Sequence, residues 1–120
     1  MSMGTIGKAM KATRTQMIEG EAERTASEFT QRFGMRDGDY IRYRKTGDHW
    51  KQARIMQVDE CYWNNAGGYT ALIVVAPLLC QGRLGKTRSL MLAVNANGNG
   101  LKGVHYCNDV ERVSSSRDND

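Results

Sequence analysis

Cationic and aromatic side chains alternate along one stretch of the chain, between residues 40 and 54. Two predicted strands and the turn between them carry these residues: Tyr40, Arg42, Arg44, Lys45, His49, Trp50, Lys51 and Arg54. Small barrels bind single-stranded nucleic acid by stacking rings on bases and placing cations against phosphates. The pattern therefore predicts a nucleic-acid-binding hairpin. Two other interpretations stay open: a protein interface, where Trp, Tyr and Arg are enriched, or partly buried Tyr40 and Trp50 rings among solvated cations.

A second basic segment lies further along the chain. No Asp or Glu occurs between Glu60 and Asp109, whereas four cations do: Arg83, Lys86, Arg88 and Lys102. The whole chain has a formal charge of +4 and a pI of about 9.1. This asymmetry indicates a positive surface that would meet phosphate or an acidic protein surface, although a solvated face explains it equally well. We count Arg83, Lys86 and Arg88 among the candidate nucleic-acid contacts.

The residue types needed for catalysis or metal binding lack the usual spacing. His49, Cys61, His105 and Cys107 are the candidate metal ligands, but only the last two are close together, and no Cys-x-x-Cys pair occurs. The three cysteines match no disulfide framework, which favours a reducing cytosol. No Ser-His-Asp context or carboxylate pair stands out. We therefore expect a protein that is not an enzyme and that holds no metal or cofactor.

Two glycine-rich segments match phosphate-binding loops in part. Residues 98–103 have the spacing of the dinucleotide fingerprint, but no helical period follows them. Residues 81–87 look like the end of a P-loop, but the first glycine of that motif would fall at Cys80. Backbone amides and Lys86 could still bind an anion weakly there. A turn between strands is the better interpretation of both segments.

The apolar run of residues 69–80 is the element around which the others must pack. Its Val and Ile residues favour an extended backbone, and a near-continuous apolar run predicts a strand buried on both faces. Pro77 lacks an N–H, which predicts a bend or a sheet edge at that point. Broken alternation predicts a bulge at Val58. Further strands are predicted over residues 40–45, 50–58, 88–95, 104–107 and 110–113.

A helix is predicted ahead of the strands. Its small and apolar residues recur at spacings of three and four: Ile18, Ala22, Thr25, Ala26, Phe29 and Phe33. Gly34 ends the helix, as glycine commonly does. Ile6, Met10 and Met17 continue the stripe upstream, so the helix would start near Thr5. Such a helix is longer than a small barrel can cover, which predicts a homodimer through the N-terminal helix.

One helix followed by five or six short strands predicts an α+β fold with a largely antiparallel sheet curved into a barrel. We expect a flexible or helical extension over residues 1–14, a single domain over residues 15–113 and a disordered tail over residues 114–120. No apolar segment approaches the ~20 residues needed to cross a bilayer, and no secretory signal is evident. A cytoplasmic protein without a membrane partner is expected.

The stretch Gly38-Asp-Tyr-Ile-Arg-Tyr-Arg, followed by Trp50-Lys-Gln-Ala-Arg-Ile-Met-Gln-Val, resembles the first hairpin of SH3-like barrels of the Tudor or KOW kind. In those families a Gly-Asp-x-hydrophobic opening leads to a strand with Trp and Ala-x-hydrophobic spacing. The resemblance covers residues 37–60 and implies a binding module rather than an enzyme. The long apolar strand and the helical extension are not typical of that family.

Nucleic-acid binding through the basic-aromatic hairpin is the leading functional hypothesis. The alternative is a regulator or inhibitor of another protein, of which viral examples are known, that acts through its helix or an exposed sheet edge.

Overall fold

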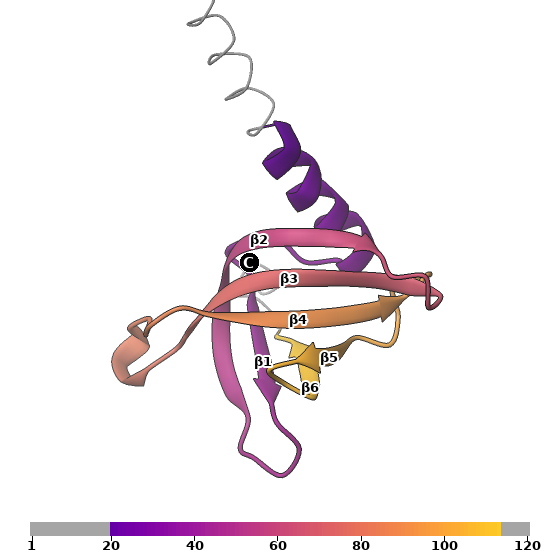
Figure 1. Ribbon diagram of the computed structural model, residues 1–120. Helices are drawn as coiled ribbons and strands as arrows, with labels where there is room; N and C mark the ends of the chain where they lie inside the picture. Colours follow the sequence, from indigo (N-terminus) through magenta and orange to yellow (C-terminus); the bar gives the residue numbers. More distant parts are fainter. Residues whose placement is uncertain (1–19, 114–120) are drawn as a thin grey trace, which may run out of the picture.

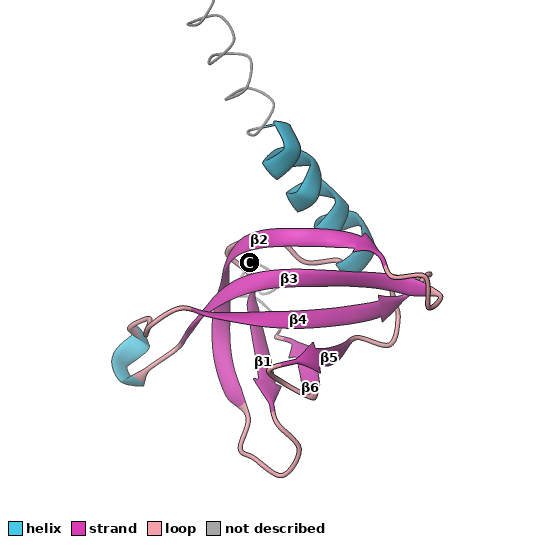
Figure 2. Cartoon of the chain, in the orientation of Figure 1, coloured by secondary structure: helices cyan, strands magenta, loops and turns pink. Residues whose placement is uncertain are grey.

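A helix leads into six antiparallel strands that curl into a nearly closed barrel (Figure 1, Figure 2). The computed structural model describes residues 20–113, and the helix is described over residues 20–33. The strands are β1 (Tyr40–Arg44), β2 (Lys51–Trp63), β3 (Gly68–Pro77), β4 (Arg88–Asn95), β5 (Lys102–His105) and β6 (Asp109–Arg112). The predicted α+β class and barrel-like sheet are confirmed.

Several predictions fall on the ends of the chain. The extension over residues 1–14, the helix start near Thr5, the dimer contact through Ile6, Met10 and Met17, and the tail over residues 114–120 lie outside the described residues. Within the described residues no helix is long and apolar enough to cross a bilayer.

The sheet has the strand order β5-β4-β3-β2-β1-β6, and every neighbouring pair is antiparallel. The 13-residue strand β2 pairs with β1 near its start and with β3 along most of its length. Its register shifts between Ile55 and Gln57 and again between Val58 and Glu60, so the bulge predicted at Val58 is confirmed. Bulges bend a strand and increase its twist, which helps one long strand follow the wall of a barrel.

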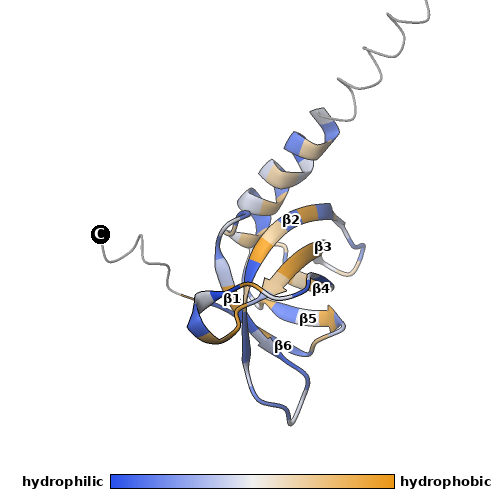
Figure 3. Cartoon of the chain, turned by 90° about the vertical axis from the view of Figure 1, so that its left-hand side faces the viewer, coloured by the Kyte–Doolittle hydropathy of each residue, from blue (hydrophilic) through white to orange (hydrophobic). Residues whose placement is uncertain are grey.

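The core fills the inner face of this curved sheet. Alternation along each strand decides which residues enter it: Ile41 and Tyr43 of β1 are buried, whereas Arg42 between them is exposed. Phe29 and Phe33 of the helix are fully buried, and their rings stack with centroids 4.8 Å apart. They pack with inner-face residues of the strands, among them Ile55, Ala71, Ile73, Val75, Leu90 and Leu92. Figure 3 shows the resulting hydrophobic colour along β3.

The central strand β3 is buried on one face only. Ile73 and Val75 have no exposed surface, but Leu72 and Val74 between them are half-buried. The prediction that the strand is buried on both faces is therefore wrong for these two residues. A sheet that curls into a barrel encloses one face of each strand and leaves the other outside. The apolar pattern of the sequence predicts nine core residues: Phe29, Phe33, Ile55, Leu72, Ile73, Val74, Val75, Leu90 and Leu92. All of them except Leu72 and Val74 are buried.

A hydrogen bond from a β6 side chain to the helix backbone joins the end of the helix to the sheet. Gly34 adopts φ of 69°, and its N–H donates to the carbonyl of Thr30 at 2.9 Å, which closes the last turn. The Arg112 guanidinium of β6 donates through Nε to the carbonyl of Phe33 at 3.1 Å. A cation at this position also interacts favourably with the negative C-terminal end of the helix dipole. The helix end is therefore held against the strand that completes the sheet.

One-sided burial of β3 gives a stability prediction. Leu92→Ala should lower the free energy of unfolding by about 2–5 kcal/mol, because it leaves a cavity in the core. Leu72→Ala should cost clearly less, because the Leu72 side chain already meets solvent. Urea unfolding of both variants, compared at equal m-values, measures the difference. Equal losses at the two positions would contradict one-sided burial.

Candidate functional site

The outer face of β1 carries a cluster of stacked and ion-paired side chains. Arg42 and Arg44 place their guanidinium carbons 4.7 and 4.4 Å from the centre of the Trp50 ring. Each arginine also lies directly across from a carboxylate of β6: Arg42 donates to Glu111 from Nε at 2.7 Å, and Arg44 donates to Asp109 at 2.8 Å. We call these five residues the arginine–tryptophan cluster.

The cluster changes what the predicted hairpin can offer a nucleic acid. A phosphate would have to compete with two carboxylates for the guanidinium groups of Arg42 and Arg44. A base would have to share the half-buried Trp50 ring with the same two groups. Exposed ion pairs are weak, about 0–1 kcal/mol each, so this competition reduces affinity rather than forbidding contact.

Strand alternation separates the predicted cations onto two faces of the sheet. Ala53 and Ile55 of β2 point inward. Because side chains alternate along a strand, Lys51 lies at an inward position, which we call inward parity, and Arg54 lies at an outward position, which we call outward parity. On β4 the inward residues Leu90 and Leu92 give Arg88 inward parity as well. The eight-residue hairpin set therefore does not form one surface. Lys51 belongs with Arg88, across the sheet from Arg42 and Arg44.

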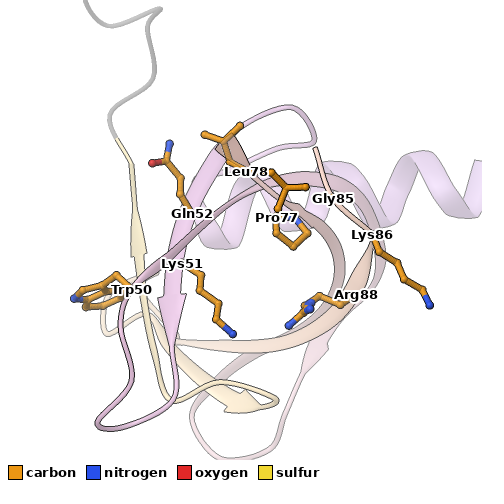
Figure 4. Close-up of a pocket in the computed structure, with 9 residues that line it drawn as sticks. Trp50, Lys51, Gln52, Pro77, Leu78, Gly85, Lys86 and Arg88 are labelled. Atoms are coloured by element: carbon orange, nitrogen blue, oxygen red, sulfur yellow. The ribbon is translucent and has the colours of Figure 1, made fainter. Parts of the chain in front are cut away.

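The inward cations lie at one end of the barrel, where two adjoining hollows open. The first, of about 470 Å³, is lined by Trp50, Lys51, Lys86 and Arg88 together with apolar residues of the β3–β4 connection (Figure 4). The second, of about 520 Å³, is lined by Lys45, Lys86, Arg88 and Tyr106 among others. Lys86 and Arg88 belong to both. In Figure 4 the ends of Lys51 and Arg88 approach each other, while Trp50 points away from the barrel.

The charge at this end of the barrel is one-sided. Of the described residues, no Asp or Glu lines either hollow, and Lys45, Lys51, Lys86 and Arg88 form no ion pair with a described carboxylate. This distinguishes them from the arginines of the arginine–tryptophan cluster. We call these four residues the barrel-end cations.

A buried tyrosine lies beneath the barrel-end cations. Tyr43 is 3% exposed, and its hydroxyl oxygen has no hydrogen-bond partner among the described residues. It lies opposite Lys51 in the β1–β2 register. Burial raises the pKa of Tyr43, and the positive charge of Arg88, together with its approach as a hydrogen-bond donor, offsets part of that rise. Arg88 therefore lies close to the Tyr43 hydroxyl, although the geometry falls short of a formed hydrogen bond.

Tyr106 lies in a tight turn beside the second hollow. Its φ of 73° is unusual for a residue with a large side chain, and 55% of its surface is exposed. The turn is closed by the Gly103 N–H, which donates to the Asn108 carbonyl at 2.9 Å. Any Cβ at Gly103 would collide with the backbone of Cys107, so the turn requires glycine there. The His105 ring packs against Tyr106 with centroids 4.1 Å apart.

The remaining predicted contacts are spread over the surface. Tyr40 is half-buried at the start of β1 and lies opposite the exposed Arg54. His49 is exposed in the β1–β2 turn. Arg83 is exposed in the β3–β4 connection, which projects from the barrel (Figure 1), and lines neither hollow. The structure thus brings Lys45, Lys51, Lys86 and Arg88 together with Trp50 and leaves the others apart.

Both glycine-rich segments are turns between strands. Residues 81–87 lead into β4, and residues 98–103 form a turn and the first two residues of β5, so no helix N-terminus follows either segment to receive a phosphate. Gln81 and Gly82 lie in a short 3-10 turn with positive φ. Lys86 contributes to the barrel end through its side chain.

Two tyrosines of this region were not among the predicted contacts. Tyr106 follows β5 without a basic-aromatic pattern around it, so no local signal marked it. Tyr43 shows inward parity in the sequence, but its place beside Arg88 depends on contacts between β1 and β4, which are not neighbours in the sheet.

The three cysteines lie in different parts of the fold: Cys61 in β2, Cys80 in the β3–β4 connection and Cys107 in the β5–β6 turn. Within the described residues, no group of three or more His, Cys, Asp or Glu side chains could hold a metal ion. Cys61, Cys80 and Cys107 are free thiols. Burial raises the pKa of Cys61 and of Cys107 to about 11, whereas Cys80 is exposed.

Thiol alkylation should separate these cysteines. At pH 8 a thiol with a pKa of about 11 is almost entirely protonated, and Cys61 and Cys107 are also shielded from reagent. Cys80 is exposed, so it should react first and alone. Raising the pH to 10 should speed Cys61 and Cys107 about a hundredfold, because thiolate rises tenfold per pH unit below the pKa. Mass spectrometry after timed iodoacetamide treatment measures this, with circular dichroism to verify folding at pH 10. Comparable rates for all three thiols at pH 8 would refute the assignment.

No model of a protein family matches this chain, and neither a curated protein nor a solved structure matches it. We therefore infer its function from the side chains at the barrel end and not from similarity to known proteins.

Proposed function

We propose that this protein is a small non-enzymatic binding protein that holds single-stranded nucleic acid at the end of its barrel. The observation that most directly supports this proposal concerns the barrel-end cations. They line two hollows that no described carboxylate lines, and none of them is ion-paired with a described carboxylate. Phosphate binding there requires no ion pair to break. Neutralisation of phosphates by such cations, with release of counterions, supplies most of the affinity of non-specific nucleic-acid binding.

The hairpin contributes to this proposal in a secondary role. Trp50 lines the first hollow and also packs against Arg42 and Arg44, so it joins the barrel end to the outer cluster. Glu111 and Asp109 balance the charges of the two arginines. A strand bound at the barrel end would run onto this cluster as a rim of weaker contacts.

The barrel supports the proposal by analogy. SH3-like modules of the Tudor or KOW kind are binding modules, and the hairpin of residues 37–60 resembles theirs. The nearly closed antiparallel barrel is compatible with such a fold. Analogy of fold ranks binding above catalysis but does not choose the ligand, which depends on the site.

A protein-binding regulator is the second candidate function. The projecting β3–β4 connection exposes Leu79 and Leu84 near Arg83, and the far end of β2 exposes Tyr62 and Trp63. Exposed leucines beside a cation suit an apolar partner surface with an acidic rim. A partner that stays bound to the protein after nuclease treatment and high salt would favour this function.

The leading proposal predicts a salt-sensitive affinity that depends on Lys51. Lys51→Gln should weaken binding to a labelled single-stranded oligonucleotide and lower the slope of log K against log[salt] by about one or less. Lys102→Gln is the matched control, because Lys102 is exposed on β5 and lines neither hollow. Fluorescence anisotropy at several salt concentrations measures both. If the unmodified protein shows no salt-sensitive affinity for any single strand, the nucleic-acid proposal is wrong.

The ion-paired cluster predicts a gain of affinity. Glu111→Gln removes the carboxylate opposite Arg42, so the guanidinium becomes free to contact phosphate. Affinity for the same oligonucleotide should rise, and the salt slope should steepen by about one or less. Glu23→Gln, on the exposed helix surface, is the control for the change in net charge. Equal gains in the two variants would show that net charge alone acts and that the rim makes no contact.

A further inference from the structure

The inward positions nearest the hollows are polar on three strands. They are Tyr43 of β1, Lys51 of β2 and Arg88 of β4, whereas Val110 of β6, opposite Tyr43, is apolar and buried. The next inward positions of the same three strands are apolar: Ile41, Ala53 and Leu90. A barrel that only needed to close its core would place apolar side chains here. Two cations and a hydroxyl at these positions keep the end of the barrel open to an anion.

The Tyr43 hydroxyl is the unusual member of this group. A buried hydroxyl without a partner costs about 1–3 kcal/mol, so most such groups are paired. Arg88 is the neighbour that can pair it, because Tyr43 lies opposite Lys51 in the β1–β2 register, and Lys51 and Arg88 line the same hollow. A guanidinium has five N–H donors in a rigid fork, so it can donate one to Tyr43 and two to a ligand.

We propose that Arg88, with Lys51 and Lys86, forms a seat for one phosphate group of a single-stranded nucleic acid, and that the Tyr43 hydroxyl orients Arg88. The phosphate draws the guanidinium into place, and Tyr43 Oη then accepts the Arg88 N–H that faces the core. Bidentate donation from arginine is the favoured geometry for phosphate. This inference rests on the proposed function and specifies the site that binds.

The second hollow adds a place for the adjoining nucleoside. It shares Lys86 and Arg88 with the first, and the exposed Tyr106 ring stands at its wall. Its volume of about 520 Å³ falls in the range of pockets that hold small organic groups. The positive φ of Tyr106 is a conformation that structures tend to retain at ligand sites. A base splayed from a single strand can enter this hollow, whereas a paired base in a duplex cannot.

Tyr43→Phe is the central test, because it removes the hydroxyl and keeps the ring. The variant should bind a labelled ten-nucleotide oligothymidylate about threefold to tenfold more weakly, the worth of one hydrogen bond. Its thermal midpoint should stay equal or rise, because an unpaired buried hydroxyl has been removed. A merely structural role would instead lower stability. Unchanged affinity in Tyr43→Phe would overturn the role of Tyr43.

Two further variants separate charge from geometry. Arg88→Lys keeps the charge but loses the fork, so affinity should fall about tenfold while the salt slope stays nearly constant. Lys86→Gln should reduce both affinity and slope, and Lys102→Gln should change neither. If the unmodified protein binds with salt sensitivity, and Arg88→Lys and Lys86→Gln bind as tightly as it does, the proposed phosphate seat is wrong and the proposed function stands. If the unmodified protein binds nothing, the proposed function itself fails.

The phosphate can come from a strand end or from within a strand, and substrate choice distinguishes the two sources. A 5′-phosphorylated oligothymidylate that binds about tenfold more tightly than its 5′-hydroxyl form would assign the seat to a terminal phosphate. Equal affinity of these two and of a circular single strand would assign it to an internal phosphodiester. A duplex that binds as tightly as the single strand, or an unchanged single-strand affinity in Tyr106→Ala, would overturn the place assigned to the base.

Discussion

The burial of one face of the curled sheet is the constraint on which the rest of this structure depends. Phe29 and Phe33 pack onto that inner face, and Arg112 holds the end of the helix against β6. The helix lies near Cys61 at the end of β2 and near Tyr69 at the start of β3, as the contact of Arg32 with Tyr69 shows. The opposite ends of the same strands carry the two hollows, so the barrel has one apolar end and one polar end.

This polarity explains why cations gather where they do. A charge inside the apolar end would lose its hydration without compensation, whereas the open end keeps Lys51 and Arg88 exposed to water. On the outside of the barrel, cross-strand carboxylates balance Arg42 and Arg44. The outer cluster therefore adds to the backbone pairing of β1 with β6, and the barrel-end cations remain to meet an anion.

Much of the architecture follows from local patterns. The helical spacing up to Phe33, the glycine that ends the helix and the approximate positions of the strands were predicted, because periodicity and turn chemistry act over a few residues. The bounds were less accurate: β2 continues to Trp63, beyond the predicted end at residue 58, and β5 ends at His105, before the predicted end at residue 107. The bulge at Val58 was readable as a break in alternation. The same alternation assigns Lys51 and Arg54 to opposite faces, although grouping them by residue type had placed them on one surface. Burial of Leu72 and Val74 was overestimated, because an apolar run shows no sign of whether its second face is covered.

The sequence by itself determined the elements, the alternation of inward and outward residues along the amphipathic strands, and the excess of positive charge between residues 61 and 108. Only the tertiary structure decided which cations of the chain are balanced by carboxylates. The pairs Arg42–Glu111 and Arg44–Asp109 join residues 69 and 65 positions apart, and they form because β6 returns to pair with β1. Tyr43 meets Arg88, and Tyr106 shares a hollow with Lys45, for the same reason. Local patterns specify a residue's face, but its neighbours across the barrel depend on how the sheet closes.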